Sequence, residues 1–324
     1  MSETLLEVKD LQVDFLIGKK TMTAVHDISF QIEKGRTLAI VGESGCGKSV
    51  TATSIMRLLP RETSRIANGE ILLEGTDLVK MSEKEIRKIR GNRIAMIFQD
   101  PMTALNPVYT IGKQMIEMCR VHNKISKAEA YKKCVQMLEI VGIPLPEQRM
   151  NEYPYQMSGG MRQRIMIAMA LSCDAQLLIA DEPTTALDVT IQAQVLDQMR
   201  KVKKEFHTAI LLITHDMGVV AEMADDVLVM YAGEIVEYGT VEDIFEHPTH
   251  PYTTGLLKSI PRLDSDDREE LFTIDGVVPA LSEFGVGCRF ANRCHCVSEN
   301  CKTAGIEYQN LGGKHICRCN LPVD

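Results

Sequence analysis

The chain has 324 residues, with apolar and charged fractions of 45% and 25% that are typical of soluble globular domains. Its 36 basic and 44 acidic residues give a net charge of −8, which disfavours nucleic-acid binding because phosphate backbones attract basic surfaces. No apolar run approaches the ~18 residues that span a bilayer, and the N-terminus lacks the layout of a secretion signal, so the sequence predicts a cytosolic protein.

The first two elements alternate apolar and polar residues, over 6–15 and 24–32. A period of two is typical of strands with one buried face, so the chain is predicted to begin with an antiparallel β region.

Four continuously apolar runs follow, and each ends in polar residues or glycine. They are 37–41 before a glycine loop, 94–98 before Gln99, 177–180 before Asp181 and Glu182, and 209–213 before Thr214 and His215. Such runs are typical of strands buried on both faces of a parallel sheet. Because α/β sheets bind ligands at their carboxyl edge, these polar residues are predicted to face the glycine loop.

Residues 42–49, Gly-Glu-Ser-Gly-Cys-Gly-Lys-Ser, form a phosphate-binding loop pattern. The glycines let backbone N–H groups turn inward around phosphate oxygens, Lys48 reaches the outer phosphates, and Ser49 opens a helix and offers its hydroxyl to Mg²⁺. The predicted nucleotide contacts are Gly42, Ser44, Gly45, Cys46, Gly47, Lys48, Ser49 and Val50.

Helices are predicted between the strands. Ser82 with Glu85, and Ser126 with Glu129, form capping boxes. Residues from about 102 to 157 have helical patterns and no convincing buried strand, so they are predicted to be a helical insert.

Two further motifs suit phosphate chemistry. Of Asp181 and Glu182, one carboxylate can hold a metal and the other can orient an attacking water, although such a pair alone is often a solvated strand end. Ser158 is predicted to cap a helix, and Gly159 and Gly160 leave its N-terminal amides open to an anion; an ordinary capped helix is the alternative.

Together these motifs resemble the nucleotide-binding subunit of an ABC transporter over roughly residues 5–245. The matching segments are Walker A at 42–49, the Q-loop at Gln99, the signature at 157–161, Walker B at 177–182, the D-loop at 186–188 and the H-loop at His215. The resemblance implies an α/β P-loop NTPase core with an antiparallel β subdomain and a helical subdomain at about 102–165. It also implies that two such domains pair head to tail, each signature closing on the ATP of the other.

The resemblance implies roles at the matching positions. Phe15 stacks on adenine, with a core phenylalanine as the alternative; Asp188 carries signals across the dimer; His215 contacts the γ-phosphate; Glu182 activates water; and the Mg²⁺ ligands are Ser49, Gln99 and Asp181. Met161 stands where the family usually has Gln, but Ser158 and both glycines are retained, so the phosphate contact is expected to persist.

Residues 247–253, His-Pro-Thr-His-Pro-Tyr-Thr, predict a rigid, non-helical connector. The segment resembles one found after the ATPase core in dipeptide and oligopeptide importers, a group that also contains nickel importers. The domains are therefore expected at 1–246 and 247–324.

Six of the ten cysteines lie in the last 37 residues: Cys288, Cys294, Cys296, Cys301, Cys317 and Cys319. Clustered cysteines in a cytosolic chain favour metal binding over disulfides. The importer resemblance implies a [4Fe–4S] cluster on Cys288, Cys294, Cys301 and Cys319, with zinc as the alternative metal and Cys317 as the alternative fourth ligand. A structural staple for the small tail is favoured over redox sensing.

The resemblance implies an ATPase subunit on the cytoplasmic face of the membrane that powers import of di- and oligopeptides. Its implied partners are a second, related ATPase subunit, two transmembrane permease subunits and, indirectly, an extracytoplasmic substrate-binding protein. The alternatives are a nickel or metal-chelate importer, a non-transport ABC ATPase, and a regulatory protein that binds ATP without hydrolysis.

Overall fold

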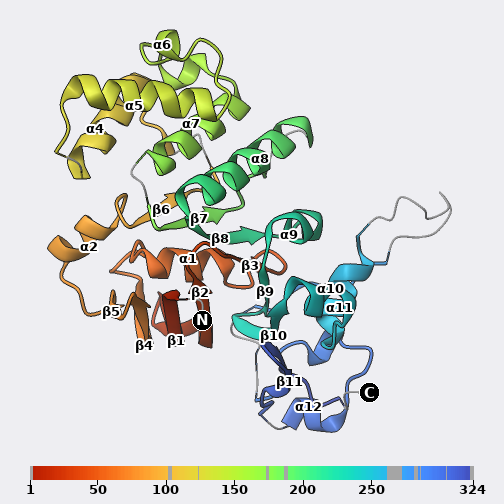
Figure 1. Cartoon of the computed structure of the whole chain (residues 1–324). Helices are drawn as coiled ribbons and strands as arrows, with labels where there is room; N and C mark the ends of the chain where they lie inside the picture. Colours follow the sequence, from red (N-terminus) through yellow and green to blue (C-terminus); the bar gives the residue numbers. More distant parts are fainter. Residues whose placement is uncertain are drawn as a thin grey trace. The chain divides into compact units, whose positions relative to one another are not determined.

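The computed structural model describes residues 3–100, 104–122, 124–172, 175–185, 189–260, 272–280, 284, 286–303 and 305–321. The chain forms two compact units (Figure 1). The first unit comprises Met1–Leu5, Ile32–Arg36 and Lys80–Leu212, and the second comprises Leu6–Gln31, Thr37–Val79 and Ile213–Asp324. Within the described ranges, no helix has both the length and the hydropathy needed to cross a bilayer.

The N-terminal β region is a four-stranded sheet that lies mainly in the second unit. Its strands are β1 (Thr4–Ile17), β2 (Lys20–Glu33), β4 (Ser64–Leu73) and β5 (Thr76–Asp77), in the order β2-β1-β4-β5. β1 pairs antiparallel with β4, as the alternating pattern predicts. Over residues 5–13 its apolar side chains are buried and its polar side chains are at least partly exposed, because a strand turns successive side chains to opposite faces, whereas Leu16 and Ile17 at the end of the strand are exposed.

A second set of strands in the same unit joins the glycine loop to the C-terminal tail. It contains β3 (Thr37–Val41), β9 (Asp226–Tyr231), β10 (Glu234–Thr240), β11 (Gln309–Gly312) and β12 (His315–Cys317). β3 and β9 are parallel and fully buried, whereas the β9–β10, β10–β12 and β11–β12 pairs are antiparallel. The tail therefore adds strands to the sheet that carries the loop.

The helices of the second unit flank these strands. They are α1 (Lys48–Ile55), α9 (Met217–Met223), α10 (Val241–Glu246), α11 (Pro251–Lys258) and α12 (Glu299–Thr303). One hydrophobic core contains residues from β3, β9, β10, α9, α10 and α11 together with Phe290 of the tail. The fully apolar strands are thus buried partly by the extension.

The first unit contains the predicted helical insert. Its strands β6 (Ile94–Ile97) and β7 (Leu177–Asp181) pair in parallel, and its helices are α2 (Glu83–Ile89), α4 (Ile111–His122), α5 (Lys127–Ile140), α6 (Pro146–Arg149), α7 (Gly159–Leu171) and α8 (Val189–Phe206). Short 3₁₀ turns occur at 154–156 here and at 291–293 in the second unit. β8 (Ala209–Thr214) is buried throughout and crosses from the first unit to the second. Both capping boxes are confirmed, at Ser82 before α2 and at Ser126 before α5.

The expectation of a non-helical connector at 247–253 is wrong, because α11 begins at Pro251. Proline suits the first position of a helix, where its fixed φ fits and its missing N–H has no intrahelical acceptor. His250 caps the helix by accepting a hydrogen bond at Nδ1 from the Tyr252 N–H at 3.1 Å. Burial lowers the pKa of His250 to about 3, so this nitrogen stays available as an acceptor at neutral pH.

Candidate active site

The glycine loop lies between the end of β3 and the start of α1. Gly42, Gly45 and Gly47 have φ of +148°, +80° and +104°, a region that glycine occupies without steric cost. A Cβ at Gly42 would lie 2.2 Å from the Met230 carbonyl oxygen of β9 and 2.8 Å from the Cys46 Sγ. The loop therefore needs glycine at 42 for close packing as well as for its backbone conformation.

Lys48 is held inside the loop by backbone carbonyls. Its Nζ donates to the Gly42 carbonyl at 2.7 Å and to the Glu43 carbonyl at 3.0 Å. Ser44, Gly45 and Ser49 are exposed, whereas Cys46, Gly47 and Lys48 are buried and Val50 is half-buried. Burial raises the pKa of the Cys46 thiol. Exposed amides at the start of a helix, with a lysine beside them, favour binding of a phosphate group.

Two residues of the C-terminal tail contact the outer side of this loop. The Glu43 N–H donates to the Tyr252 hydroxyl at 2.8 Å, and Arg293 donates to both carboxylate oxygens of Glu43 at 2.5 and 3.0 Å. The hydrogen bond to Glu43 raises the pKa of Arg293, and burial raises the pKa of Tyr252. Sequence reasoning missed both residues, although Arg293 lies in the cysteine motif that the sequence singled out.

Gln99 and Glu182 meet in the first unit. Ile97 of β6 is opposite Ala180 of β7, so the residues two positions further on emerge side by side. Gln99 Nε2 donates to Glu182 Oε2 at 2.9 Å, and the Thr185 hydroxyl, which sequence reasoning missed, donates to the same oxygen at 2.9 Å.

The chain bends sharply between the two carboxylate residues Asp181 and Glu182. Asp181 ends β7 and is buried, whereas Glu182 is half-buried with φ of +47°, a conformation uncommon outside glycine. The bend gives the two adjacent carboxylates different surroundings, which suits one to metal binding and the other to proton transfer.

The predicted cap at Ser158 is confirmed. Its hydroxyl accepts from the Met161 N–H at 3.3 Å and starts α7. A Cβ at Gly159 would meet no described atom within 4 Å, whereas one at Gly160 would lie 3.1 Å from Ile191. Gln163 Nε2, which sequence reasoning also missed, donates to the Pro183 carbonyl at 2.6 Å and ties α7 to the loop after β7.

The remaining predicted residues are distributed over both units. Phe15, half-buried in β1, lines a small cavity with Asp14 and Arg65, and His215 is exposed directly after β8. Both lie in the second unit with the glycine loop, whereas Gln99, Glu182 and Ser158 lie in the first. Asp188 falls outside the described residues.

Five of the six tail cysteines line one small cavity. They are Cys288, Cys294, Cys296, Cys301 and Cys319, and the cavity is also bounded by His250 and Phe290. Burial, together with charge repulsion from neighbouring thiolates, raises the pKa of Cys288 to about 11. Cys317 is buried at the end of β12 and is not among the cavity residues.

No group of three His, Cys, Asp or Glu side chains within the described ranges is already arranged around one metal-ion position.

Comparisons with known proteins agree with these motifs. Residues 25–185 match the ABC transporter family, and residues 236–301 match the oligopeptide/dipeptide transporter C-terminal region. A probable peptide ABC transporter ATP-binding protein of Sinorhizobium fredii is 53% identical over 98% of this chain and 95% of its own length. The oligopeptide transport ATP-binding protein OppD of Bacillus subtilis is 56% identical over 89% of this chain and 81% of its own length.

A solved structure shows the same fold. It is the dimeric, post-hydrolysis state of the ATP-binding cassette MJ0796 bound to ADP and Pi, with a TM-score of 0.66 and 25% identity over 73% of this chain and 99% of that one. The motif order, the loop geometry and these similarities agree. The chain therefore belongs to the ATP-binding proteins of ABC transporters, in the group that carries the oligopeptide/dipeptide transporter C-terminal region.

Proposed function

We propose that this chain is the ATP-hydrolysing subunit of a membrane ABC transporter that imports di- and oligopeptides. The observation that carries the proposal is the joint presence of a phosphate-binding loop, a Gln99–Glu182 pair at adjacent strand ends, and a peptide-transporter C-terminal region. Relatives more than 50% identical over most of the chain are named as peptide transport ATP-binding proteins, which favours peptide over nickel as cargo.

In the proposed reaction, the loop and the start of α1 hold the ATP phosphates, and Lys48 neutralises their charge. Glu182 accepts a proton from the attacking water. Gln99 and Thr185 orient the Glu182 carboxylate, because both donate hydrogen bonds to Glu182 Oε2. Ser49, Gln99 and Asp181 would hold Mg²⁺, which would neutralise charge at the phosphates. Phe15 stacks on adenine and His215 contacts the γ-phosphate.

The proposed active form pairs this chain with a second, related ATPase subunit. Ser158, Gly159 and Gly160 face the ATP of that subunit, and Asp188 carries signals across the interface. The open N-terminus of α7 at Gly159 and the dimeric state of the matched cassette support the pairing. The assembled complex sits on the cytoplasmic face of the membrane with two permease subunits and an extracytoplasmic substrate-binding protein.

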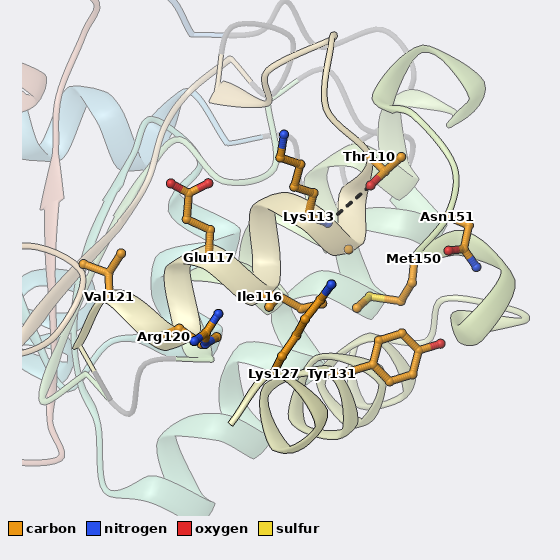
Figure 2. Close-up of a pocket in the computed structure, with 11 residues that line it drawn as sticks. Thr110, Lys113, Ile116, Glu117, Arg120, Val121, Lys127, Tyr131, Met150 and Asn151 are labelled. Atoms are coloured by element: carbon orange, nitrogen blue, oxygen red, sulfur yellow. Dashed lines mark hydrogen bonds between the residues drawn. The ribbon is translucent and has the colours of Figure 1, made fainter. Parts of the chain in front are cut away.

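The helical insert offers a docking surface for a permease subunit. A groove of about 680 Å³ runs along α4 and α5, with charged side chains such as Lys113 and Lys127 beside the apolar Ile116, Val121 and Met150 (Figure 2). Val121 is 67% exposed, and Val108, Leu145 and Tyr155 of the same insert are also more than 60% exposed. Exposed apolar side chains with a charged rim are typical of protein interfaces.

We expect the complete transporter, reconstituted in vesicles, to accumulate labelled oligopeptide in an ATP-dependent manner and not to accumulate Ni²⁺. Val121→Asp should lower uptake about tenfold or more, because an unpaired charge would be buried against the permease, while ATP hydrolysis by this chain paired with its partner ATPase subunit, without permease, is retained. The control is Val277→Asp, the same change at a valine 82% exposed outside the insert, which should leave uptake intact. Uptake of Ni²⁺ instead of peptide would establish the metal-importer alternative.

We also propose that a [4Fe–4S] cluster resides at the cysteine cavity and staples the tail. Four thiolates are the usual ligand set for such a cluster, and Cys288, Cys294, Cys301 and Cys319 all line the cavity. Cys319 is preferred to Cys317 as the fourth ligand because only Cys319 lines the cavity. Cys296 is exposed and is left as an additional thiol.

Full-length protein purified without oxygen is expected to be brown and to contain about four iron and four sulfide per chain. Cys319→Ser should lose most of the iron, because a ligand is removed, whereas the control Cys317→Ser should retain it. Stoichiometric zinc without iron in the purified protein would contradict the cluster. Loss of iron in Cys317→Ser but not in Cys319→Ser would make Cys317 the fourth ligand in place of Cys319.

A further inference from the structure

One peptide group of the phosphate-binding loop is held at both ends. The Gly42 carbonyl accepts from Lys48 Nζ at 2.7 Å, and the N–H of the same peptide, on Glu43, donates to the Tyr252 hydroxyl at 2.8 Å. Rotation of this peptide would therefore break a bond to the phosphate-binding lysine and a bond to α11 together. Tyr252 is fully buried, so water is poorly placed to replace its hydroxyl.

The side chain of Glu43 is held equally firmly. Arg293 donates from Nη1 and Nη2 to the two carboxylate oxygens, a two-point geometry that fixes orientation as well as distance. The Arg293 side chain is 5% exposed; its Nε donates to the Asp275 carbonyl at 2.7 Å, and Nη2 also donates to the carbonyls of Ile274 and Gly276, each at 3.2 Å. Arg293 is thus bonded to the tail backbone as well as to Glu43.

Aromatic packing connects these two residues. Tyr252 lies 4.8 Å from Tyr231 and 5.3 Å from Phe290, measured between ring centroids, with edge-on or tilted geometry. Phe290 immediately precedes the 3₁₀ turn that ends at Arg293. Tyr252 and Arg293 therefore form one bracket against the loop, and both residues lie beyond the ATPase core at about 5–245.

We infer that Tyr252 and Arg293 are positioning residues for the ATP site: they orient the Gly42–Glu43 segment so that its carbonyls hold Lys48 where it meets the outer phosphates. The C-terminal extension is then a structural part of the nucleotide site. The inference rests on the proposed role of the loop in ATP binding. It predicts that the bracket affects ATP affinity more than the turnover of bound ATP.

The test measures the Kd for ATP on the full-length chain by fluorescence of a labelled ATP analogue, and kcat at saturating ATP on the full-length chain assembled with its partner ATPase subunit. Tyr252→Phe, which removes only the hydroxyl, should raise the Kd about three- to tenfold. Arg293→Ala should raise it about tenfold or more, and Arg293→Lys should recover part of the loss because it restores charge without the two-point geometry. We expect kcat to change by less than about twofold in the variants that bind ATP.

Two comparisons separate positioning from general stability. Lys314→Ala removes another ion pair between the tail and the sheet, Lys314 to Asp226 at 3.2 Å, and should leave the Kd within about twofold. Arg293→Ala combined with Glu43→Gln should weaken binding less than the product of the two single changes, because both remove one interaction.

An unchanged Kd in folded Tyr252→Phe, with the melting temperature of the unmodified chain, would overturn the inference while leaving the ATP site intact. Equal weakening in Lys314→Ala would show a general effect of the tail and also overturn it. Failure of the unmodified chain to bind ATP would overturn the proposed function, and the inference with it.

Discussion

Replacing Glu182 with glutamine is expected to lower the kcat for ATP hydrolysis by roughly 10²- to 10⁴-fold, the contribution typical of a general base. Glutamine has nearly the same shape and keeps a side-chain oxygen that can accept from Gln99 and Thr185, which both donate to Glu182 Oε2 at 2.9 Å. It lacks the basicity to accept a proton from water. ATP binding should therefore persist, since the phosphate-binding loop is unchanged.

The measurement is phosphate release under saturating ATP, with the Kd for ATP determined in parallel. Glu139→Gln, an equivalent change at an exposed carboxylate of α5, serves as the control and should leave kcat unchanged. Near-normal hydrolysis by Glu182→Gln would reject the assigned base. A parallel loss of ATP binding would point to a structural defect instead.

The second large effect is expected for Gly42→Ala, which should weaken ATP binding by more than about tenfold and lower the free energy of unfolding by about 2 kcal/mol. The added Cβ would lie 2.2 Å from the Met230 carbonyl oxygen, which is too close for two atoms that are not bonded to each other. The φ of +148° is itself unfavourable for alanine. Relief requires movement of the loop away from β9, which displaces the carbonyl that binds Lys48.

Gly45→Ala is the matched control in the same loop. Gly45 also has positive φ, at +80°, but a Cβ there would meet no described atom within 4 Å. Its cost to the free energy of folding is backbone strain alone, on the order of 1–2 kcal/mol, without the displacement of Lys48. Chemical denaturation and ATP titration of both variants compare the two mechanisms directly. Equal ATP affinity of the two variants would contradict the role assigned to the contact with Met230.

Much of the core and of its chemistry could be predicted because the signals are local. The four apolar runs form buried strands except at Phe98, which follows the end of β6 and is 41% exposed, and the capping boxes at Ser82 and Ser126 form as their spacing indicates. The helical insert likewise follows from periodicity over short windows. Such patterns reflect the directions of side chains within one helix or strand, so they can be interpreted without knowledge of the fold.

Other features depended on contacts that short windows do not contain. The hydrogen bond between Gln99 and Glu182 spans 83 residues and follows from the parallel register of β6 and β7. Thr185 and Gln163 acquire their partners only when the loop after β7 turns. The connector predicted at 247–253 differs from the structure because proline stops a helix in its interior yet suits the first turn, where α11 begins at Pro251.

By itself, the sequence determined the buried strands, the phosphate-binding loop and the family to which the chain belongs. Each strand and each motif consists of residues that are neighbours along the chain or one helical turn apart, and the family follows from the motifs. Only the tertiary structure decided that Arg293 forms hydrogen bonds with Glu43, which lies 250 positions away in the sequence. It also decided that Cys319, and not Cys317, lines the cysteine cavity. Such pairings form when distant segments bury their apolar surface together, and the geometry of that burial is a property of the whole fold.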